Sequence, residues 1–281
     1  MELRDIIQPI DHELDIFDEY FRKAMSSKVA FVDMVARYIV RQKGKRIRPA
    51  LVLLTAKACG AISESSFRGA ALVEILHTAT LIHDDVVDEA DTRRGFPSIN
   101  AVWKNKIAVL MGDYMLAKGL LLSLDNDDFL FLKIISDKTA SLISTCCQIG
   151  AASVTRDVEV LNRIREFGEN VGMVFQIRDD LLDYTGRRSI TGKPTGLDVK
   201  EKKLTLPLIY AFTKAPSPQS KAILRIIKNG ARTKELQQVV EFAHEFGGID
   251  YTTKKAEHYS SRALEALSRS EERRVGKECR L

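Results

Sequence analysis

Two aspartate clusters, each at the end of a long apolar stretch, constrain this 281-residue chain more than any other feature. The first, Asp84-Asp85-x-x-Asp88, follows LVEILHTATLIH, and the second, Asp179-Asp180-x-x-Asp183, follows VGMVFQI. On composition alone, one such match arises by chance with a probability of roughly 0.1. Carboxylates clustered next to buried apolar residues cost free energy to desolvate unless cations compensate their charge. A solvated acidic helix face therefore explains the two clusters poorly.

Helical spacing recurs along the chain, whereas the alternation of apolar and polar residues that marks strands is nearly absent. We expect helices at 29–40, from Arg48-Pro49 to Gly60, from a cap at Ser63 to about Asp88, and at 101–123, 129–152 and 157–184. The Gly- and Pro-containing stretches 91–100 and 186–203 read as loops, and Pro207 opens another helix. The sequence therefore predicts an all-α, single-domain helical bundle over residues 1–269, followed by an atypical charged tail at 270–281 without function.

Composition excludes several classes of protein. The formal net charge of +5 is dispersed, which does not favour nucleic-acid binding but suits a protein that handles small anions. The four cysteines form no C-x-x-C pair, as expected for reduced thiols in a cytoplasmic protein. Lys133, Asp137 and Lys138 interrupt the most apolar stretch, 129–154, so we expect a buried helix there and no membrane span.

The spacing within each cluster has a geometric meaning. Asp84 and Asp88 are four residues apart, so they share one helix face, and His77 falls on the same stripe. Asp179 and Asp183 are also four apart, with Gln176 one turn earlier. Such faces offer oxygen ligands, which suit Mg²⁺ bridging carboxylates to substrate phosphates, and no Cys/His set for zinc is present.

Basic residues flank both acidic clusters. Lys45 and Arg48 lie near a helix start, and Arg93 and Arg94 follow the first cluster. Three lysines adjoin apolar helices, namely Lys138, Lys193 and Lys203. A single pair of basic residues is most often solvated surface. Together these basic residues favour a diphosphate site, because Arg and Lys side chains bind phosphate oxygens. No G-x-x-x-x-G-K-[ST] pattern supports a nucleotide P-loop.

The segments GKRIRP, LIHDDVVDEADTRRG, FQIRDDLLDYTG, GKPTGLD and KKLTLP resemble the trans-polyprenyl diphosphate synthases, over about residues 1–268. Within that family the chain is most similar to the bacterial medium- and long-chain enzymes of the octaprenyl and heptaprenyl type, which make quinone side chains. The resemblance implies the isoprenoid synthase helical fold and a homodimer. It also implies a Mg²⁺-dependent prenyltransferase that condenses isopentenyl diphosphate with an allylic diphosphate to give a longer trans-polyprenyl diphosphate.

The resemblance also assigns roles to residues. Metal ligation falls to Asp84, Asp88 and Asp179, supported by Asp85, Asp180 and Asp183. Isopentenyl diphosphate is held by Lys45, Arg48, His77 and Arg94, and the allylic diphosphate by Arg93, Lys138, Lys193 and Lys203. Thr139 and Gln176 line the reaction centre. The small residues Ala79 and Thr80, four to five positions before the first cluster, leave the chain-length pocket open and predict a product beyond the fifteen-to-twenty-carbon class.

The chain departs from that family in the distance between its clusters. They begin 95 residues apart, at positions 84 and 179, where the resemblance leads us to expect roughly 30 more, or about 45 Å of helix. The gap falls near Ser136-Asp137 and corresponds to one to two missing helices. An inactive or non-catalytic partner subunit of a prenyl synthase is therefore an alternative. A terpene cyclase is a second one, against which Lys45, Arg48 and Arg94 argue, because a cyclase needs no second diphosphate site.

Overall fold

The computed structural model describes residues 3–42, 44–93, 95–126, 128–136, 142–185, 197–200, 203–230 and 233–278. Packing divides the chain into two compact units, Met1–Gly168 and Glu169–Leu281, which are treated separately below. The described residues are helical apart from one short hairpin and the connections, so the expectation of an all-α fold is confirmed. The division into two units was not predicted from the sequence.

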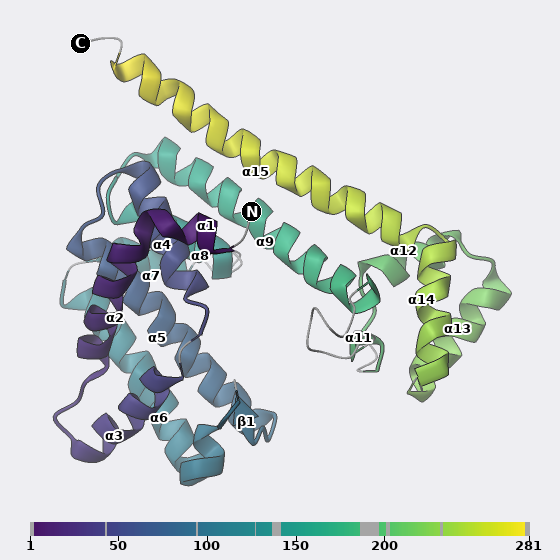
Figure 1. Cartoon of the computed structure of the whole chain (residues 1–281), viewed down its shortest axis with the longest axis horizontal. Coiled ribbons are helices and arrows are strands. Elements are labelled where there is room, and N and C mark those ends of the chain that lie inside the picture. Colours follow the sequence, from purple (N-terminus) through teal and green to yellow (C-terminus); the bar gives the residue numbers. More distant parts are fainter. Residues whose placement is uncertain are drawn as a thin grey trace. The chain divides into compact units, whose positions relative to one another are not determined.

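The first unit is built around one long helix, α5 (Glu64–Val87), which packs against α6, α4, α8 and α2 (Figure 1). Its elements are α1 (Leu3–Ile7), η1 (Gln8–Ile10), α2 (Asp11–Met25), α3 (Ala30–Arg41), α4 (Ile47–Cys59), α5, β1 (Thr92–Arg93), β2 (Phe96–Pro97), α6 (Ile99–Leu124), α7 (Phe129–Ser136), α8 (Leu142–Ala152) and the start of α9 (Val158–Thr185). Ser63 caps α5 as predicted, in a capping box with Ser66. Small residues on α5, such as Gly69 and Ala70, let its neighbours approach closely.

Two apolar clusters fill the first unit, one including residues 70–73 of α5 and the other including Ile75, Ala79 and Ile82 further along the same helix. The first surrounds Leu53, Leu72 and Ile149 from α4, α5 and α8, and the second surrounds Ile75 and Met115 from α5 and α6. Because both clusters contain α5 side chains, burial fixes which face of this helix is left for chemistry.

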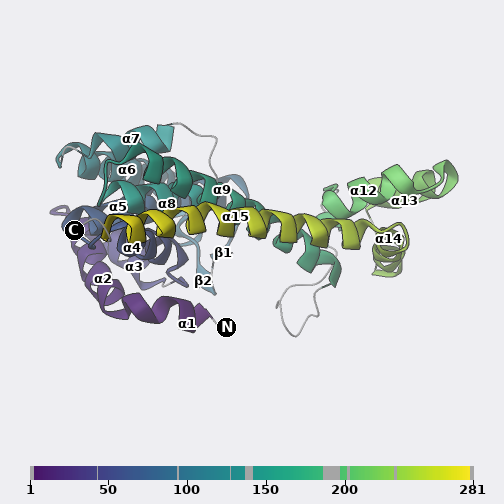
Figure 2. The same cartoon turned by 90° about the horizontal axis from the view of Figure 1, so that it is seen from above.

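The second unit contains the rest of α9 with α11 (Leu197–Lys200), α12 (Leu206–Lys214), α13 (Ser217–Asn229), α14 (Thr233–Glu245) and α15 (Gly248–Glu278). Figure 2 shows α12, α13 and α14 gathered at the beginning of α15. The rings of Tyr210 and Tyr251 stack between α12 and α15 with centroids 4.0 Å apart. Burial of Leu208, Val239 and other apolar side chains joins these helices to α9 in one core.

Three local expectations differ from the structure, and a fourth is tested only in part. Both α7 and α8 lie within the helix expected at 129–152, with 137–141 outside the described residues. The 91–100 loop contains the antiparallel pair β1–β2, since Gly95 has a φ of +79° and allows a tight turn. The 186–203 loop includes α11, and α15 continues through the charged tail to Glu278, because Glu, Arg and Lys favour helix without an apolar stripe.

One helix of the described residues, α6, is long and apolar enough to cross a membrane by length and composition alone. Core helices of globular proteins pass the same test, and only 33% of its most apolar window is buried. The helix is interrupted at Lys104, whose φ is 71°. An apolar helix with this much exposed surface leaves part of its face uncovered within the first unit.

Candidate active site

The first aspartate cluster ends α5 and divides its carboxylates between two faces. Asp84 and Asp88 are exposed, whereas Asp85 is buried with 3% of its surface accessible. Successive helical residues differ by about 100° in direction, so adjacent Asp84 and Asp85 cannot share an environment, while Asp84 and Asp88 do. The structure therefore leaves two carboxylates of the motif accessible to a ligand and places the third inside the protein.

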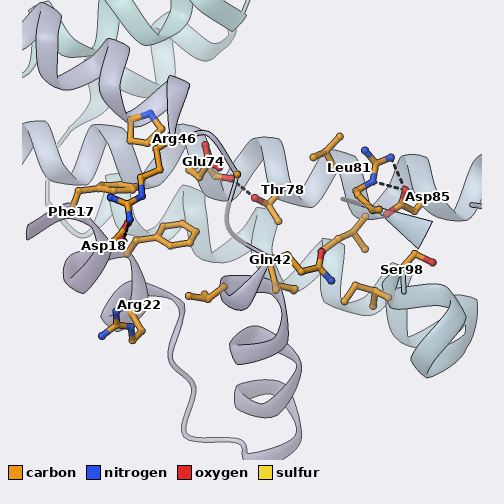
Figure 3. Close-up of a pocket in the computed structure, with 18 residues that line it drawn as sticks. Phe17, Asp18, Arg22, Gln42, Arg46, Glu74, Thr78, Leu81, Asp85 and Ser98 are labelled. Atoms are coloured by element: carbon orange, nitrogen blue, oxygen red, sulfur yellow. Dashed lines mark hydrogen bonds and ion pairs between the residues drawn. The ribbon is translucent and has the colours of Figure 1, made fainter. Parts of the chain in front are cut away.

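Arg93 on β1 forms an ion pair with the buried Asp85. Its Nε and one terminal nitrogen both lie 2.6 Å from Oδ1 of Asp85 (Figure 3). The hydrogen bond to Asp85 raises the pKa of Arg93 despite partial burial, and the negative charges of Asp85, Asp84 and Asp88 add to the shift. Arg93 was predicted to hold the allylic diphosphate; here its guanidinium reaches a ligand only through the N–H groups that Asp85 leaves available.

The loop between Asp88 and α6 is held by side-chain hydrogen bonds to backbone carbonyls. Asn100 Nδ2 donates to the carbonyls of Ala90, at 3.1 Å, and Asp85, at 3.3 Å. Ser98 Oγ donates to the same Ala90 carbonyl at 2.6 Å. On the other side, the Tyr38 hydroxyl donates to the Pro97 carbonyl at 2.8 Å. These bonds fix the hairpin that carries Arg93 relative to α5.

The GKRIRP segment forms the start of α4 and places its cations on different sides. Arg46 is the N-terminal cap residue of α4, and the side chain of Lys45 is exposed. A terminal nitrogen of Arg48 lies 3.7 Å from Glu74 of α5. Pro49 follows in the first turn of the helix, where its missing N–H costs no hydrogen bond.

A pocket in the first unit lies beside both features. Figure 3 shows Glu74, Thr78, Leu81 and Asp85 of α5 along one wall, with Arg46 at one end and Ser98 at the other. Residues of α2 and α3 also line the pocket, among them Phe17 and Phe21 of α2. The lining therefore combines apolar side chains with a few charged groups, as sites for small ligands commonly do.

Three further predicted residues lie earlier on α5. His77 is half-buried, and Thr80 is exposed on the Asp84 stripe, with its hydroxyl donating to the His77 carbonyl at 2.7 Å. Ala79 is fully buried in the cluster that contains Met115 of α6. Thr80 thus has an accessible side chain beside Asp84, whereas Ala79 faces the packing between α5 and α6.

The second cluster lies on the part of α9 that belongs to the second unit. Asp179 is exposed, and Gln176 Nε2 donates to Asp180 Oδ1 at 3.0 Å. A surface groove is lined by Gln176, Asp179, Asp180 and Lys203, together with residues 204–206 and Ile209. The hydroxyl of Tyr184 hydrogen-bonds to that of Thr205, 2.8 Å away, and so ties α9 to the segment that carries Lys203. The structure brings four of the predicted residues together here.

Among the described residues, no three Asp, Glu, His or Cys side chains converge as a metal-binding group. This donor arrangement still fits Mg²⁺, which keeps several waters and commonly takes one or two carboxylates plus substrate phosphates. Asp84 and Asp88 supply such a pair on one exposed face, and Asp179 supplies a single exposed carboxylate. The residues present therefore suit a metal that is completed by a diphosphate ligand.

Four predicted residues lie outside the described residues: Arg94, Lys138, Thr139 and Lys193. Two carboxylates that sequence reasoning missed, Asp18 and Glu74, contact the arginines of GKRIRP. Glu74 could have been found, because it lies one turn before His77 on the same helix. Asp18 carried no signal, since its partner is 28 residues away and only the packing of α2 on α4 brings them together.

Comparison with known proteins decides the family. The sequence pattern of the family described as Polyprenyl synthetase matches residues 29–130 and 122–243. The chain belongs to the polyprenyl synthetase family. The resemblance inferred from the sequence is thus confirmed. This family member is 38% identical to the all-trans-nonaprenyl-diphosphate synthase (geranyl-diphosphate specific) of Rhodobacter capsulatus, over 94% of this chain and 91% of that one.

Two solved structures share the fold of this polyprenyl synthetase. A decaprenyl diphosphate synthase from Rhodobacter capsulatus matches with a TM-score of 0.82 and 30% identity, over 94% of this chain and 92% of that one. A polyprenyl synthase from Caulobacter crescentus CB15, complexed with calcium and isoprenyl diphosphate, matches with a TM-score of 0.79 and 28% identity, over 95% and 92%. The Caulobacter crescentus protein thus binds a divalent cation and an isoprenyl diphosphate in one complex.

The alignment with the nonaprenyl synthase also bears on the spacing between the clusters. It runs over 297 positions, whereas 94% of the 281 residues of this chain is about 264. The difference, 297 minus 264, leaves about 33 aligned positions with no residue of this chain. That deficit is close to the number of residues expected to be missing between Asp84 and Asp179.

Proposed function

We propose that this chain is a trans-prenyltransferase that condenses isopentenyl diphosphate with an allylic diphosphate to give a longer trans-polyprenyl diphosphate. One observation carries the proposal: in a polyprenyl synthetase, each D-D-x-x-D motif has an exposed aspartate and lies against a cation, Arg93 paired with the buried Asp85 in one unit and Lys203 in the groove with Asp179 in the other. Anionic metal ligands next to phosphate-binding cations are what the ionisation of a diphosphate ester requires.

Asp84, Asp88 and Asp179 would hold Mg²⁺, and Asp85, Asp180 and Asp183 would support them. When bound, the metal supplies positive charge that stabilises the departing diphosphate. Asp85 contributes by fixing Arg93, and Gln176 by fixing Asp180. Divalent-metal use is supported by the calcium in the Caulobacter crescentus structure, and the oxygen-only donor set supports the proposal that the ion is Mg²⁺.

The cations are proposed to divide between the two substrates. Isopentenyl diphosphate would be held by Lys45, Arg48, His77 and Arg94, and the allylic diphosphate by Arg93, Lys138, Lys193 and Lys203. In the reaction, the allylic C–O bond breaks, the double bond of isopentenyl diphosphate forms the new C–C bond, and loss of a proton restores a trans alkene. Thr139 and Gln176 would face the positive charge with oxygen dipoles.

The product is proposed to exceed twenty carbons, as quinone side chains do. Thr80 lies exposed beside Asp84 and presents only a small side chain, which supports an open path for the growing chain. The names of the relatives in Rhodobacter capsulatus, a nonaprenyl and a decaprenyl synthase, point the same way. Ala79 is proposed to contribute through helix packing, because it is fully buried.

A homodimer is proposed on the exposed face of α6. Seven apolar side chains of this helix are between 39% and 63% exposed, namely Val102, Val109, Leu110, Leu116, Leu120, Leu121 and Leu124. A patch of this size on one helix is typical of an interface between subunits. A second copy of the chain covers it economically, since a two-fold interface pairs the same patch with itself.

A missing segment of one to two helices near Ser136-Asp137 is also proposed, supported by the shortfall in the alignment. Phe129, at 57%, and Leu142, at 39%, are exposed on either side of this point. Lost neighbours would leave such apolar surface behind. The free, buried thiols of Cys146 and Cys147 agree with the proposed cytoplasmic location.

An assay with radiolabelled isopentenyl diphosphate, farnesyl diphosphate and Mg²⁺ tests the function. Chain-extended products longer than twenty carbons are the expected result. No turnover by the folded protein would favour the non-catalytic subunit, and a cyclic hydrocarbon would favour a terpene cyclase. Reinserting about 30 residues from a relative at position 136 tests the missing segment: the longer chain should turn over faster, and an unchanged or lower rate would contradict it.

A further inference from the structure

Arg46, between the predicted substrate-binding residues Lys45 and Arg48, has a left-handed backbone. Its φ is 52° and its ψ is 26°, a conformation that side-chain-bearing residues rarely adopt. Only two other non-glycine residues in the described part of the chain have a positive φ. A conformation that costs free energy persists only when surrounding contacts hold it in place.

The contacts that hold Arg46 come from α2. A terminal nitrogen of its guanidinium lies 2.7 Å from Asp18, and another lies 3.8 Å from Asp15 (Figure 3 shows the Asp18 pair). The side chains of Arg46 and Asp18 are 31% and 22% exposed, whereas that of Asp15 is 80% exposed. The shorter and better-shielded contact, with Asp18, is therefore the effective one.

The ion pair between Arg46 and Asp18 directs the three cationic side chains of GKRIRP to different sides. Arg46 turns toward α2, Lys45 remains exposed, and Arg48 points toward Glu74 of α5. Arg46 also starts the helix, because its carbonyl accepts the first helical hydrogen bond, from the Ala50 amide at 3.0 Å. The direction in which Lys45 and Arg48 leave the backbone thus depends on the turn at Arg46.

We propose that Asp18 and Arg46 are positioning residues: their ion pair sets the left-handed turn that presents Lys45 and Arg48 to isopentenyl diphosphate. The inference rests on the proposed function, since it assigns no new substrate. It adds a carboxylate on α2, remote in sequence from every motif, that acts on substrate through the backbone of the segment it holds. Neither residue needs to touch the diphosphate.

The chain offers a matched control. Glu13 of α2 and Lys57 at the last turn of α4 form a second ion pair between the same two helices, at 3.1 Å and with comparable exposure of 23% and 47%. Glu13→Gln removes an α2–α4 ion pair at the end of α4 away from GKRIRP. Any effect of loosened packing between these helices appears in Glu13→Gln as well as in Asp18→Asn.

Michaelis constants for both substrates are measured for Asp18→Asn, Arg46→Ala, Arg46→Gly and Glu13→Gln. Asp18→Asn should raise the KM for isopentenyl diphosphate about tenfold, with kcat and the allylic KM within about twofold of wild type. Arg46→Gly should raise it less than Arg46→Ala, because glycine adopts the left-handed turn without strain. Glu13→Gln should leave it unchanged.

The proposal is overturned if Asp18→Asn keeps the wild-type KM, if Glu13→Gln raises it equally, or if both substrates are affected alike. Calorimetric titration with isopentenyl diphosphate distinguishes a failure of the positioning role from a failure of the proposed function. A wild-type chain that binds this substrate without turnover refutes the function, while the ratio of dissociation constants between Asp18→Asn and wild type still decides the positioning role. Absence of binding by the wild type refutes both.

Discussion

The close approach of α4 and α8 at Gly150 makes a quantitative test of the first unit. A Cβ built on Gly150 lies 2.3 Å from the Val52 carbonyl oxygen and 3.0 Å from Cβ of Thr55, where real Cβ atoms essentially never come within 3.0 Å. The obstacle is backbone, which cannot rotate away, so Gly150→Ala forces the two helices apart by at least 0.7 Å, the difference between 3.0 and 2.3 Å. Overpacking of this kind lowers the free energy of unfolding by about 3 kcal/mol at its upper range. The higher helix propensity of alanine relative to glycine offsets about 1 kcal/mol of that loss.

The net loss of about 2 kcal/mol should lower the midpoint of thermal unfolding by about 6 °C for a unit of this size. Far-ultraviolet circular dichroism measures this midpoint. Gly119→Ala on α6 is the matched control, because its Cβ would meet side-chain methyl groups and no backbone: Ile75 Cγ2 and Leu76 Cδ2 at 3.3 Å and Leu72 Cδ1 at 3.5 Å. That variant should unfold within about 3 °C of wild type. A Gly150→Ala protein as stable as wild type would mean that α4 and α8 do not pack in this way.

Three further outcomes follow from the structure. Asp84→Ala should abolish prenyl transfer while leaving the circular dichroism spectrum and thermal midpoint unchanged, because the side chain is exposed; unchanged activity would refute its metal role. Burial raises the pKa of Glu13. Hydrogen bonds with its own backbone and with Lys57 lower the pKa by more than burial raises it, so the net pKa is below its usual value. Its stabilising contribution is present above the unfolded pKa and lost as pH falls through the folded one; Glu13→Gln should lose less stability than wild type between pH 5 and pH 3, as urea titrations would show. Burial raises the pKa of Cys147 to about 11 and that of Cys146 further, so maleimide at pH 8 should label neither until the protein is unfolded, as peptide mass spectrometry can check.

Apolar periodicity predicted the helices well because most of them bury one face. The start of α5 was predicted from Ser63, and the start of α12 from Pro207, since capping and proline chemistry are local. The helix expected at 129–152 is not tested between α7 and α8, because residues 137–141 lie outside the described residues.

The sequence motifs name candidate site residues but not their partners. Gln176, Asp179, Asp180 and Lys203 line one groove, because three of them share one helix and Tyr184 ties the fourth segment to it. The pairing of Arg93 with Asp85 was not predicted, since it depends on a hairpin whose register no pattern in the sequence specifies.

The different environments of the aspartates within each D-D-x-x-D motif follow from helix geometry. A helix that packs one face must send neighbouring side chains in directions about 100° apart, so two adjacent aspartates cannot both reach a ligand with equal ease. On α5, Asp84 and Asp88 are exposed while Asp85 is buried against Arg93; on α9, Asp179 is exposed while Asp180 accepts from Gln176. The first and last carboxylates on α5 and the first on α9 suit a metal, whereas the middle one of each motif organises a neighbouring side chain. Asp85→Asn should therefore impair turnover through a misplaced Arg93, and rescue of activity by excess Mg²⁺ would argue for direct ligation instead.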